Sequence, residues 1–406
     1  MADPASPLDL GNDETPRLGR ARRALLKRLA DVVSLPTSRV NTFERSMIGD
    51  LLIEILREAD PSDRAKVARR LSGLAEIPAP VLRLLLRDSI EIAGPLLEDS
   101  PAVTDADLIG CIRDAGPDHR RMIARRKSVS EVVSEALIAA GESHVIEILL
   151  RNEGARFSQI ALEEILAESR DHASYIAALL RRPELRPSQA YVMFWWAAPE
   201  ERAFILSRFA VSREVLQEVA GDVFALAAEE RWADPLVRKA LQFIERRQRN
   251  RAAVEKSPFA SLEDAVAAAQ NGFTRDTASE IAYLAGLKPM TGAKILTDPT
   301  GEPLAILCKA TGLPKSALRA LWRGLRRPEV DSAGNVASAL ERSLTIYDSM
   351  AVDRAQTVLR YWNWALSSAL TPALVGAIRR RDEEEIDEYS PPQRAAMLAL
   401  AADFRS

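Results

Sequence analysis

Hydrophobic residues recur at helical spacing from about residue 22 onward. Leu25, Leu29, Val32 and Val33 fall at i, i+4, i+7 and i+8, the spacing of one helix face. A second helix is predicted from about residue 42 to 58, with an apolar side of Phe43, Met47, Leu51, Ile55 and Leu56. Clusters of Pro, Ser, Asp and Gly interrupt the later segments, and no convincing run of alternating β-branched residues is present. The pattern predicts an all-α protein.

An internal repeat organises the first half of the chain. An aliphatic residue, followed in four of five cases by Ala, begins similar segments at residues 67, 92, 123, 146 and 176. These starts recur every 23 to 31 residues, in the lower part of the range for helical solenoids. Each start is followed by a break and a second helical pattern, so stacked helix pairs are predicted. The alternative is a chance match among Ala- and Leu-rich helices.

Composition breaks divide the rest of the chain. The acids and prolines of residues 1–20, with no apolar core, predict a disordered tail rather than a signal peptide. Residues 21–245 are predicted to form the helical-repeat domain, and its aromatic residues between 191 and 209 a dense core cluster. A basic stretch at 246–256 is typical of a linker or an exposed helix end. A helical hairpin region at 257–327 and C-terminal helices at 331–406 are predicted to follow.

Composition agrees with a helical, soluble protein. Hydrophobic residues make up 47% of the 406 residues, but aromatics only 5%. Ala, Leu, Arg and Glu, which favour helices, dominate. The formal net charge of −3 argues against a wholly basic nucleic-acid-binding surface but permits a local basic ridge. Cys111 and Cys308 lack the spacing of a disulfide framework or a zinc site, and no apolar stretch approaches the roughly 20 residues of a membrane span. A cytoplasmic protein with no membrane association is predicted.

Several short motifs are similar to those of the bacterial family called domain of unknown function 2336. They occupy residues 88–97 (DSIEIAGPLL), 100–101, 105–108, 150–152, 154–158 (GARFS) and 307–313 (LCKATGL). The resemblance covers most of the chain and implies an all-helical, HEAT-like repeat solenoid followed by a C-terminal helical region. It implies no activity, and therefore no residue roles.

The sequence contains none of the common catalytic motifs. It has no P-loop, no dinucleotide-binding glycine pattern, no zinc-protease, no serine-hydrolase and no EF-hand motif. His119, His144 and His172 each precede a repeat start and fit an N-terminal helix turn better than a ladder of ligands. We therefore predict no catalytic residues, no cofactor and no metal site.

A basic ridge is the stronger candidate for a binding site. Cations fall near the end of the first helix of four of the five repeats, and stacking would bring them into a row able to hold phosphates or an acidic protein. The candidate residues are Arg69, Arg70, Arg125, Arg126, Lys127, Arg151, Arg181 and Arg182. The alternative is that these cations only complement helix C-termini.

A second candidate site is a helix, glycine turn, helix pattern around Gly312. Lys315, Ser316, Arg319 and Arg323 on its second helix could face a DNA groove, although any tight helical hairpin uses glycine in the same way.

Three functions remain open from the sequence. The favoured hypothesis is a non-enzymatic scaffold that binds a protein or anionic partner through its repeat surface. Nucleic-acid binding is the alternative. An enzyme of the DNA glycosylase type is a distant third, because HEAT-like repeats also occur there and only the fold supports it. A homo-oligomer is left open.

Overall fold

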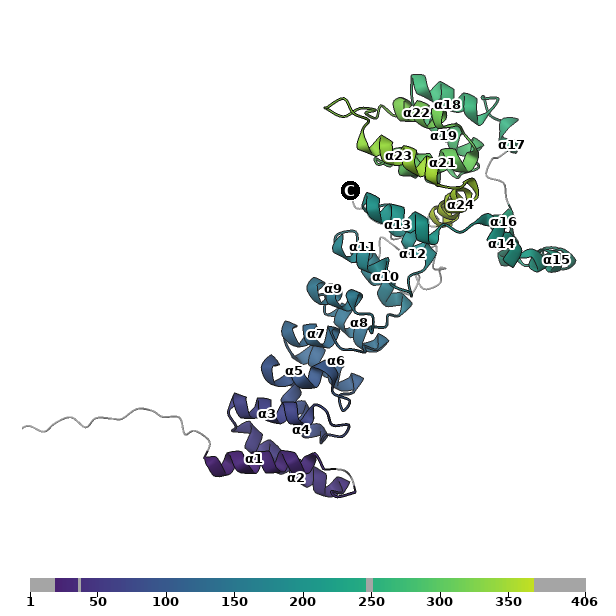
Figure 1. Cartoon of the computed structure of the whole chain (residues 1–406). Coiled ribbons are helices and arrows are strands. Elements are labelled where there is room, and N and C mark those ends of the chain that lie inside the picture. The colour runs from purple at the N-terminus through teal and green to yellow at the C-terminus, as the bar shows by residue number, and fades with distance from the viewer. Residues whose placement is uncertain (1–18, 36–37, 246–250, 369–406) are drawn as a thin grey trace, which may run out of the picture. The chain divides into compact units, whose positions relative to one another are not determined.

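The computed structural model describes residues 19–35, 38–245 and 251–368 (Figure 1). These residues form α-helices and no strand, apart from two isolated bridges, so the all-α prediction is confirmed. Contacts divide the chain into two compact units, residues 1–165 and 166–406. Residues 1–18 of the predicted tail and 369–406 of the predicted C-terminal helices lie outside the described residues.

Helices of the first unit follow one another with short connections. They are α1 (Arg20–Val33), α2 (Thr42–Arg57), α3 (Pro61–Leu71), α4 (Ala79–Leu86), α5 (Ile90–Asp99), α6 (Asp105–Asp114), α7 (Pro117–Ala124), α8 (Glu131–Ala139), α9 (Ser143–Arg151) and α10 (Gln159–Glu168), whose last turn belongs to the second unit.

The first unit is built in two series of helices. The odd-numbered helices pack in succession, α3 on α5, α5 on α7 and α7 on α9, while α2 packs on α4 and α6 on α8 (Figure 1). Four predicted repeat starts, Val67, Ile92, Ile123 and Ile146, lie on α3, α5, α7 and α9, and all are buried. The packing of neighbouring helices is therefore consistent with repeats.

The 150–158 motif has a structural explanation. The Asn152 amide, directly after α9, donates to the carbonyl oxygens of Ala124 (2.9 Å) and Arg126 (2.7 Å). It therefore supplies hydrogen-bond donors to the unpaired carbonyl groups at the end of α7. Gly154 lies against the Lys127 carbonyl, where any side chain would collide. Its own carbonyl accepts a hydrogen bond from Val129 N at 3.1 Å, which joins the loops of adjacent repeats.

The predicted apolar side of α2 is wrong for three of its residues. Phe43, Met47 and Leu51 are 77%, 53% and 54% exposed, because α2 turns its opposite face toward α1 and α4. Gly49 on that opposite face lies so close to Pro78 that an added Cβ would approach its ring to 2.9 Å. The close approach fixes the rotation of α2 and leaves an apolar stripe in solvent.

Helices of the second unit form two groups along the chain. The first is α11 (Ser174–Leu179), α12 (Pro187–Met193), α13 (Pro199–Phe209), α14 (Arg213–Val219), α15 (Gly221–Glu229) and α16 (Pro235–Glu245). The second is α17 (Arg251–Val254), α18 (Leu262–Asn271), α19 (Arg275–Leu284), α20 (Pro289–Thr297), α21 (Glu302–Thr311), α22 (Lys315–Gly324), α23 (Ser338–Ser349) and α24 (Val352–Ser368).

Helix α21 is the centre of the second group. Nearly all of its residues are buried, and it packs on α20, α22, α23 and α24. The motif at 307–313 covers the last five residues of this helix and the two residues after it. Gly312 then takes a left-handed conformation (φ 71°) that ends the helix. This motif is therefore a core helix and its C-terminal cap.

The predicted aromatic cluster is confirmed in part. Tyr191 and Phe194 are buried and meet residues of α24, with ring centres 5.0 Å apart for Tyr191 with Tyr361 and for Phe194 with Trp362. Phe204 instead is 42% exposed. These contacts join the end of the predicted 21–245 domain to the predicted C-terminal helices.

Candidate partner-binding surfaces

A groove lies between α1 and α3 in the first unit. It encloses about 670 Å³, within the usual range for binding sites. Its floor is apolar, formed by Leu26, Ala30 and Val67. Each helix adds a row of charged side chains at helical spacing, namely Arg23, Lys27 and Asp31 from α1 and Asp63, Lys66 and Arg70 from α3.

The charges of the groove do not cancel. Its four cations face two carboxylates, a formal excess of two positive charges. Asp63 is 7% exposed and lies 2.7 Å from Lys66 Nζ and 3.8 Å from Arg23 Nε, while Asp31 lies 3.2 Å from Arg70 Nη2. These ion pairs hold Arg23, Lys66 and Arg70 along the groove, and the excess positive charge favours an anionic ligand.

Sequence reasoning found only Arg70 among these groove cations. Arg23 and Lys27 were missed because α1 precedes the first repeat start, and Lys66 was missed because it lies before the basic end of α3. The available signal was the i, i+4, i+8 spacing of charges at 23, 27 and 31, directly beside the apolar positions 26 and 30.

The structure separates the predicted basic ridge into exposed and inward-facing residues. In the first unit, Arg69, Arg125 and Lys127 are exposed, and Arg151 lies 3.6 Å from Glu147 on its own helix. Arg126 instead points inward. Its guanidinium donates to the carbonyl oxygens of Leu96, Leu97 and Ser100, at the end of α5. Arg126 therefore caps α5, the odd-numbered helix before its own.

The two ridge residues of the second unit divide in the same way. Arg181 is exposed, whereas Arg182 is 5% exposed and lies 2.9 Å from Glu184. Arg208 on α13 donates to the carbonyl oxygens of Leu180 and Arg182, just beyond α11. An arginine thus caps an odd-numbered helix here too.

A smaller groove of about 240 Å³ lies between α4 and α6. Arg83, Arg87 and Arg113 line its edge together with Asp107. Cys111 lies at its floor, 4% exposed, and burial raises the pKa of this thiol to about 11. The thiol is protonated at neutral pH, so it is a packing residue rather than a nucleophile.

The predicted nucleic-acid hairpin corresponds to α21 and α22. Lys315, Ser316, Arg319 and Arg323 lie on the side of α22 away from its buried residues Leu318, Leu321 and Trp322. Two of the cations have carboxylate partners, since Lys315 pairs with Asp348 and Arg323 with Glu329 at 3.0 Å. The pairing lowers the positive charge that this face offers to a phosphate backbone.

A buried ion network ties α13 to the loop before α21. Arg202, 3% exposed, lies 3.4 Å from Asp298 and 3.5 Å from Glu302, and its guanidinium stacks on Phe194 at 4.8 Å. Burial raises the pKa of Glu302, while Arg202 and Arg342 oppose that shift. Arg202, Asp298 and Glu302 are all buried, so we interpret the network as a structural element.

The histidines and acids do not converge on a metal. His119 is 8% exposed, with its Nε2 2.9 Å from the Asp88 carbonyl oxygen, and the ring of His172 stacks on Tyr175 at 5.1 Å. Within the described residues, no group of three or more His, Cys, Asp or Glu side chains could hold a metal ion.

Comparisons with known proteins place the chain in a family. No described helix is long and apolar enough to cross a bilayer. Searches of curated proteins and of solved structures gave no match. The model of the family described as uncharacterised protein conserved in bacteria (DUF2336) matches residues 92–360. This match covers more than half of the 406 residues, and it includes the Asn152–Gly154 cap and the central helix α21. The chain is therefore a member of the DUF2336 family.

Proposed function

We propose that this protein is a non-enzymatic scaffold that binds an acidic protein segment in the α1–α3 groove. One observation carries the proposal: four cations and two carboxylates surround an apolar floor in a groove of about 670 Å³. A peptide with acidic residues on both sides of an apolar one would match this arrangement. Its carboxylates would pair with Lys27 and Arg70, and its apolar side chain would cover Leu26 and Val67.

The stacked helices support a repeat surface for such binding. In our proposal α3 to α9 form a HEAT-like solenoid, in which each odd-numbered helix repeats the position of the one before it. A solenoid presents an extended face along its length, so the exposed Arg69, Arg125 and Lys127 would continue the partner contact beyond the groove. A cytoplasmic location is part of this proposal.

The arrangement of the cations favours nucleic-acid binding less than protein binding. The α22 face carries three cations, two of which pair with carboxylates, and the exposed ridge cations are interrupted by the inward-facing Arg126. The alternative stays a prediction from the sequence, and salt-sensitive retention of DNA would revive it.

The test compares two double variants of equal charge change in a pull-down from native cell lysate, with and without nuclease. Lys27→Glu with Arg70→Glu reverses the charge of two groove residues. Arg69→Glu with Arg125→Glu reverses the charge of two exposed ridge residues. We expect the groove variant to recover nuclease-resistant partner proteins at least about tenfold less well than the ridge variant.

Each result of this comparison has one meaning. Loss only in the ridge variant would transfer the site to the ridge predicted from the sequence. Equal recovery by the wild type and both variants would end the proposal. Recovery of nucleic acid that disappears on nuclease treatment would favour the alternative function.

A further inference from the structure

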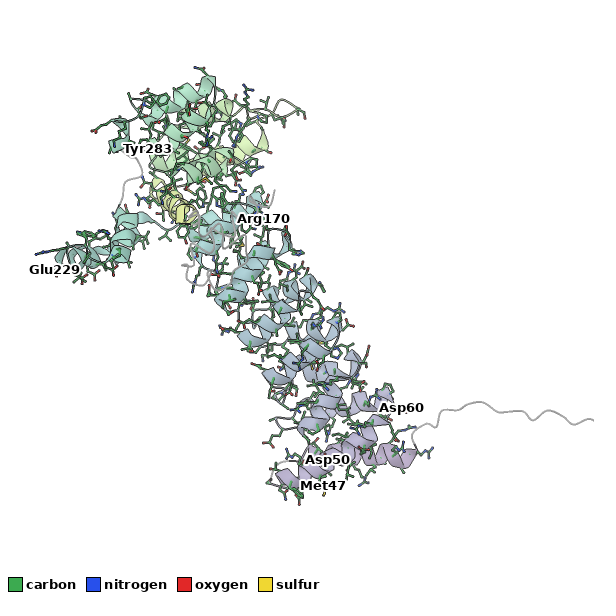
Figure 2. The ribbon with its side chains drawn as sticks, turned by 180° about the vertical axis from the view of Figure 1, so that it is seen from behind. Met47, Asp50, Asp60, Arg170, Glu229 and Tyr283 are labelled. Carbon is green, nitrogen blue, oxygen red and sulfur yellow. The ribbon has the colours of Figure 1, made fainter. Side chains whose placement is uncertain are left out.

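The first helix pair leaves an apolar face uncovered at the end of the described stack. α1 packs on α2 and α3, and α2 packs on α1 and α4. Phe43, Met47 and Leu51, at i, i+4 and i+8 of α2, face away from these neighbours and are more than half exposed. Figure 2 shows Met47 at the outer edge of this end of the first unit. Terminal repeats ordinarily carry a polar outer face, so this end differs from a usual cap.

Helix α1 extends the same face. It turns Arg23, Lys27 and Asp31 toward the groove with α3. Leu25, Leu29 and Val32 lie on the opposite flank of the helix by their spacing. Leu25 is 49% exposed, and Leu29 and Val32 are only half-buried. The two helices together present one apolar surface, which we call the end face: Leu25, Leu29, Val32, Phe43, Met47 and Leu51.

Opposite charges border the two sides of the end face. Beside the apolar flank of α1 lies the exposed Arg28, and beside Phe43 and Met47, at the edge of the α2 stripe, lies the exposed Asp50. Glu54 and Glu58 lie on the α2 stripe itself by their spacing, where they pair with Arg57 and with Arg22 of α1. The two helices are antiparallel, because Arg22 near the start of α1 lies 2.9 Å from Glu58 at the end of α2. At the edges of the end face, α1 therefore supplies the basic Arg28 and α2 the acidic Asp50.

From this pattern we infer that the end face binds a second copy of the chain, with α1 of each copy lying on α2 of the other. A two-fold axis parallel to the helices produces this arrangement and covers both apolar flanks at once. An axis across the helices would instead place α1 on α1 and α2 on α2, bringing like charges together, which is disfavoured. The charge borders thus select one of the two symmetric arrangements.

The antiparallel pairing also predicts a specific contact. Since Arg22 is level with Glu58, Arg28 is level with position 52 of α2. In the proposed dimer Arg28 of one copy lies next to Asp50 of the second copy, and the two-fold axis creates this contact twice. The inference is independent of the α1–α3 groove, because its residues are on the other flank of α1.

Sedimentation velocity of the full-length protein over a wide concentration range tests the dimer. We expect Met47→Asp with Leu51→Asp to weaken self-association by roughly 30-fold or more, because both residues lie at the centre of the end face. Helix content and melting temperature should not fall, since both side chains are exposed. A wild-type chain that stays monomeric at all concentrations, or a dimer unaffected by these changes, would overturn the inference.

Charge reversal supplies a sharper test. Arg28→Glu alone and Asp50→Lys alone each create like-charge contacts in the dimer, so each should associate roughly tenfold more weakly than the wild type. An equimolar mixture of the two variants should recover the wild-type affinity. In the mixed dimer the introduced carboxylate of one variant meets the introduced ammonium group of the other, and the unchanged Arg28 meets the unchanged Asp50. Failure of the mixture to associate better than either variant would contradict the proposed arrangement.

Thiol labelling shows whether a second copy or another part of the same chain buries the end face. Cys111 and Cys308 are buried, so in Met47→Cys a thiol reagent such as Ellman's reagent reports the new thiol. Protection that grows with protein concentration supports a second copy. Protection that is independent of concentration means that the same chain covers the face, and full reactivity at every concentration means that nothing does. Both of these last results overturn the inference.

Discussion

Arginine and asparagine side chains connect neighbouring odd-numbered helices by capping carbonyl groups. The last carbonyls of a helix lack partners within the helix, and leaving them unpaired when buried destabilises the fold. Arg126 supplies donors to the end of α5, and Asn152 supplies them to the end of α7. These helices are therefore joined by specific polar contacts as well as by apolar packing. This explains why a residue in a basic run can have a structural role.

Replacing Arg126 with Ala should lower the free energy of unfolding by about 2 kcal/mol, because three carbonyl oxygens lose a charged donor. Arg125→Ala is the matched control, since the Arg125 side chain is exposed, and its effect should stay within about 0.5 kcal/mol. Urea unfolding followed by far-UV circular dichroism measures both. Equal effects would show that Arg126 does not act as a cap.

At the scale of elements, two glycines begin and end α21 in the left-handed conformation. Gly301 (φ 78°) precedes the helix and lies against the ring of Trp322, which is buried and donates to the Pro328 carbonyl at 3.0 Å. Gly312 (φ 71°) follows the helix and has open space where a side chain would be. The same backbone conformation thus occurs in two different packing environments.

Gly301→Ala should therefore destabilise the second unit more than Gly312→Ala. Each substitution costs about 1 kcal/mol for the left-handed conformation. At position 301 the methyl group also displaces Trp322, which adds roughly 1–3 kcal/mol. Denaturation followed by tryptophan fluorescence measures the difference, and similar midpoints for the two variants would refute it.

On the scale of the whole molecule, the two units differ in their intrinsic probes. All six tryptophans lie beyond residue 165, at positions 195, 196, 232, 322, 362 and 364. Helices are present in both units, so circular dichroism reports on the whole chain, whereas tryptophan fluorescence reports on the second unit. Comparing the two signals shows whether each core unfolds by itself.

Leu71→Ala should separate these signals. Leu71 is fully buried on α3, and its truncation should cost about 3 kcal/mol within the first unit. We expect part of the circular dichroism transition to move to lower denaturant, while the fluorescence midpoint stays unchanged. Leu321→Ala, fully buried on α22, should shift the fluorescence midpoint instead. If Leu71→Ala shifts both signals equally, the units unfold as one.

The sequence alone determined the helical class and the family, and it predicted four positions that are buried on successive odd-numbered helices. These follow from local information: helix-forming composition, the spacing of apolar residues and short motifs such as that at 150–158. Val67, Ile92, Ile123 and Ile146 are buried on α3, α5, α7 and α9 because each of these helices must bury one apolar face.

Tertiary structure decided which face each helix buries and which cations remain available. The spacing of apolar residues predicted one wide apolar side for α2. In the structure, Gly49 packs against Pro78, so α2 buries the face that contains Gly49 and leaves Phe43, Met47 and Leu51 exposed. Arg125, Arg126 and Lys127 are adjacent in sequence, yet only Arg126 turns inward to α5. The α1–α3 groove likewise needs charges from two helices about 40 residues apart in the chain. Such choices depend on the neighbouring helix rather than on local sequence, because a helix end or groove exists only after packing.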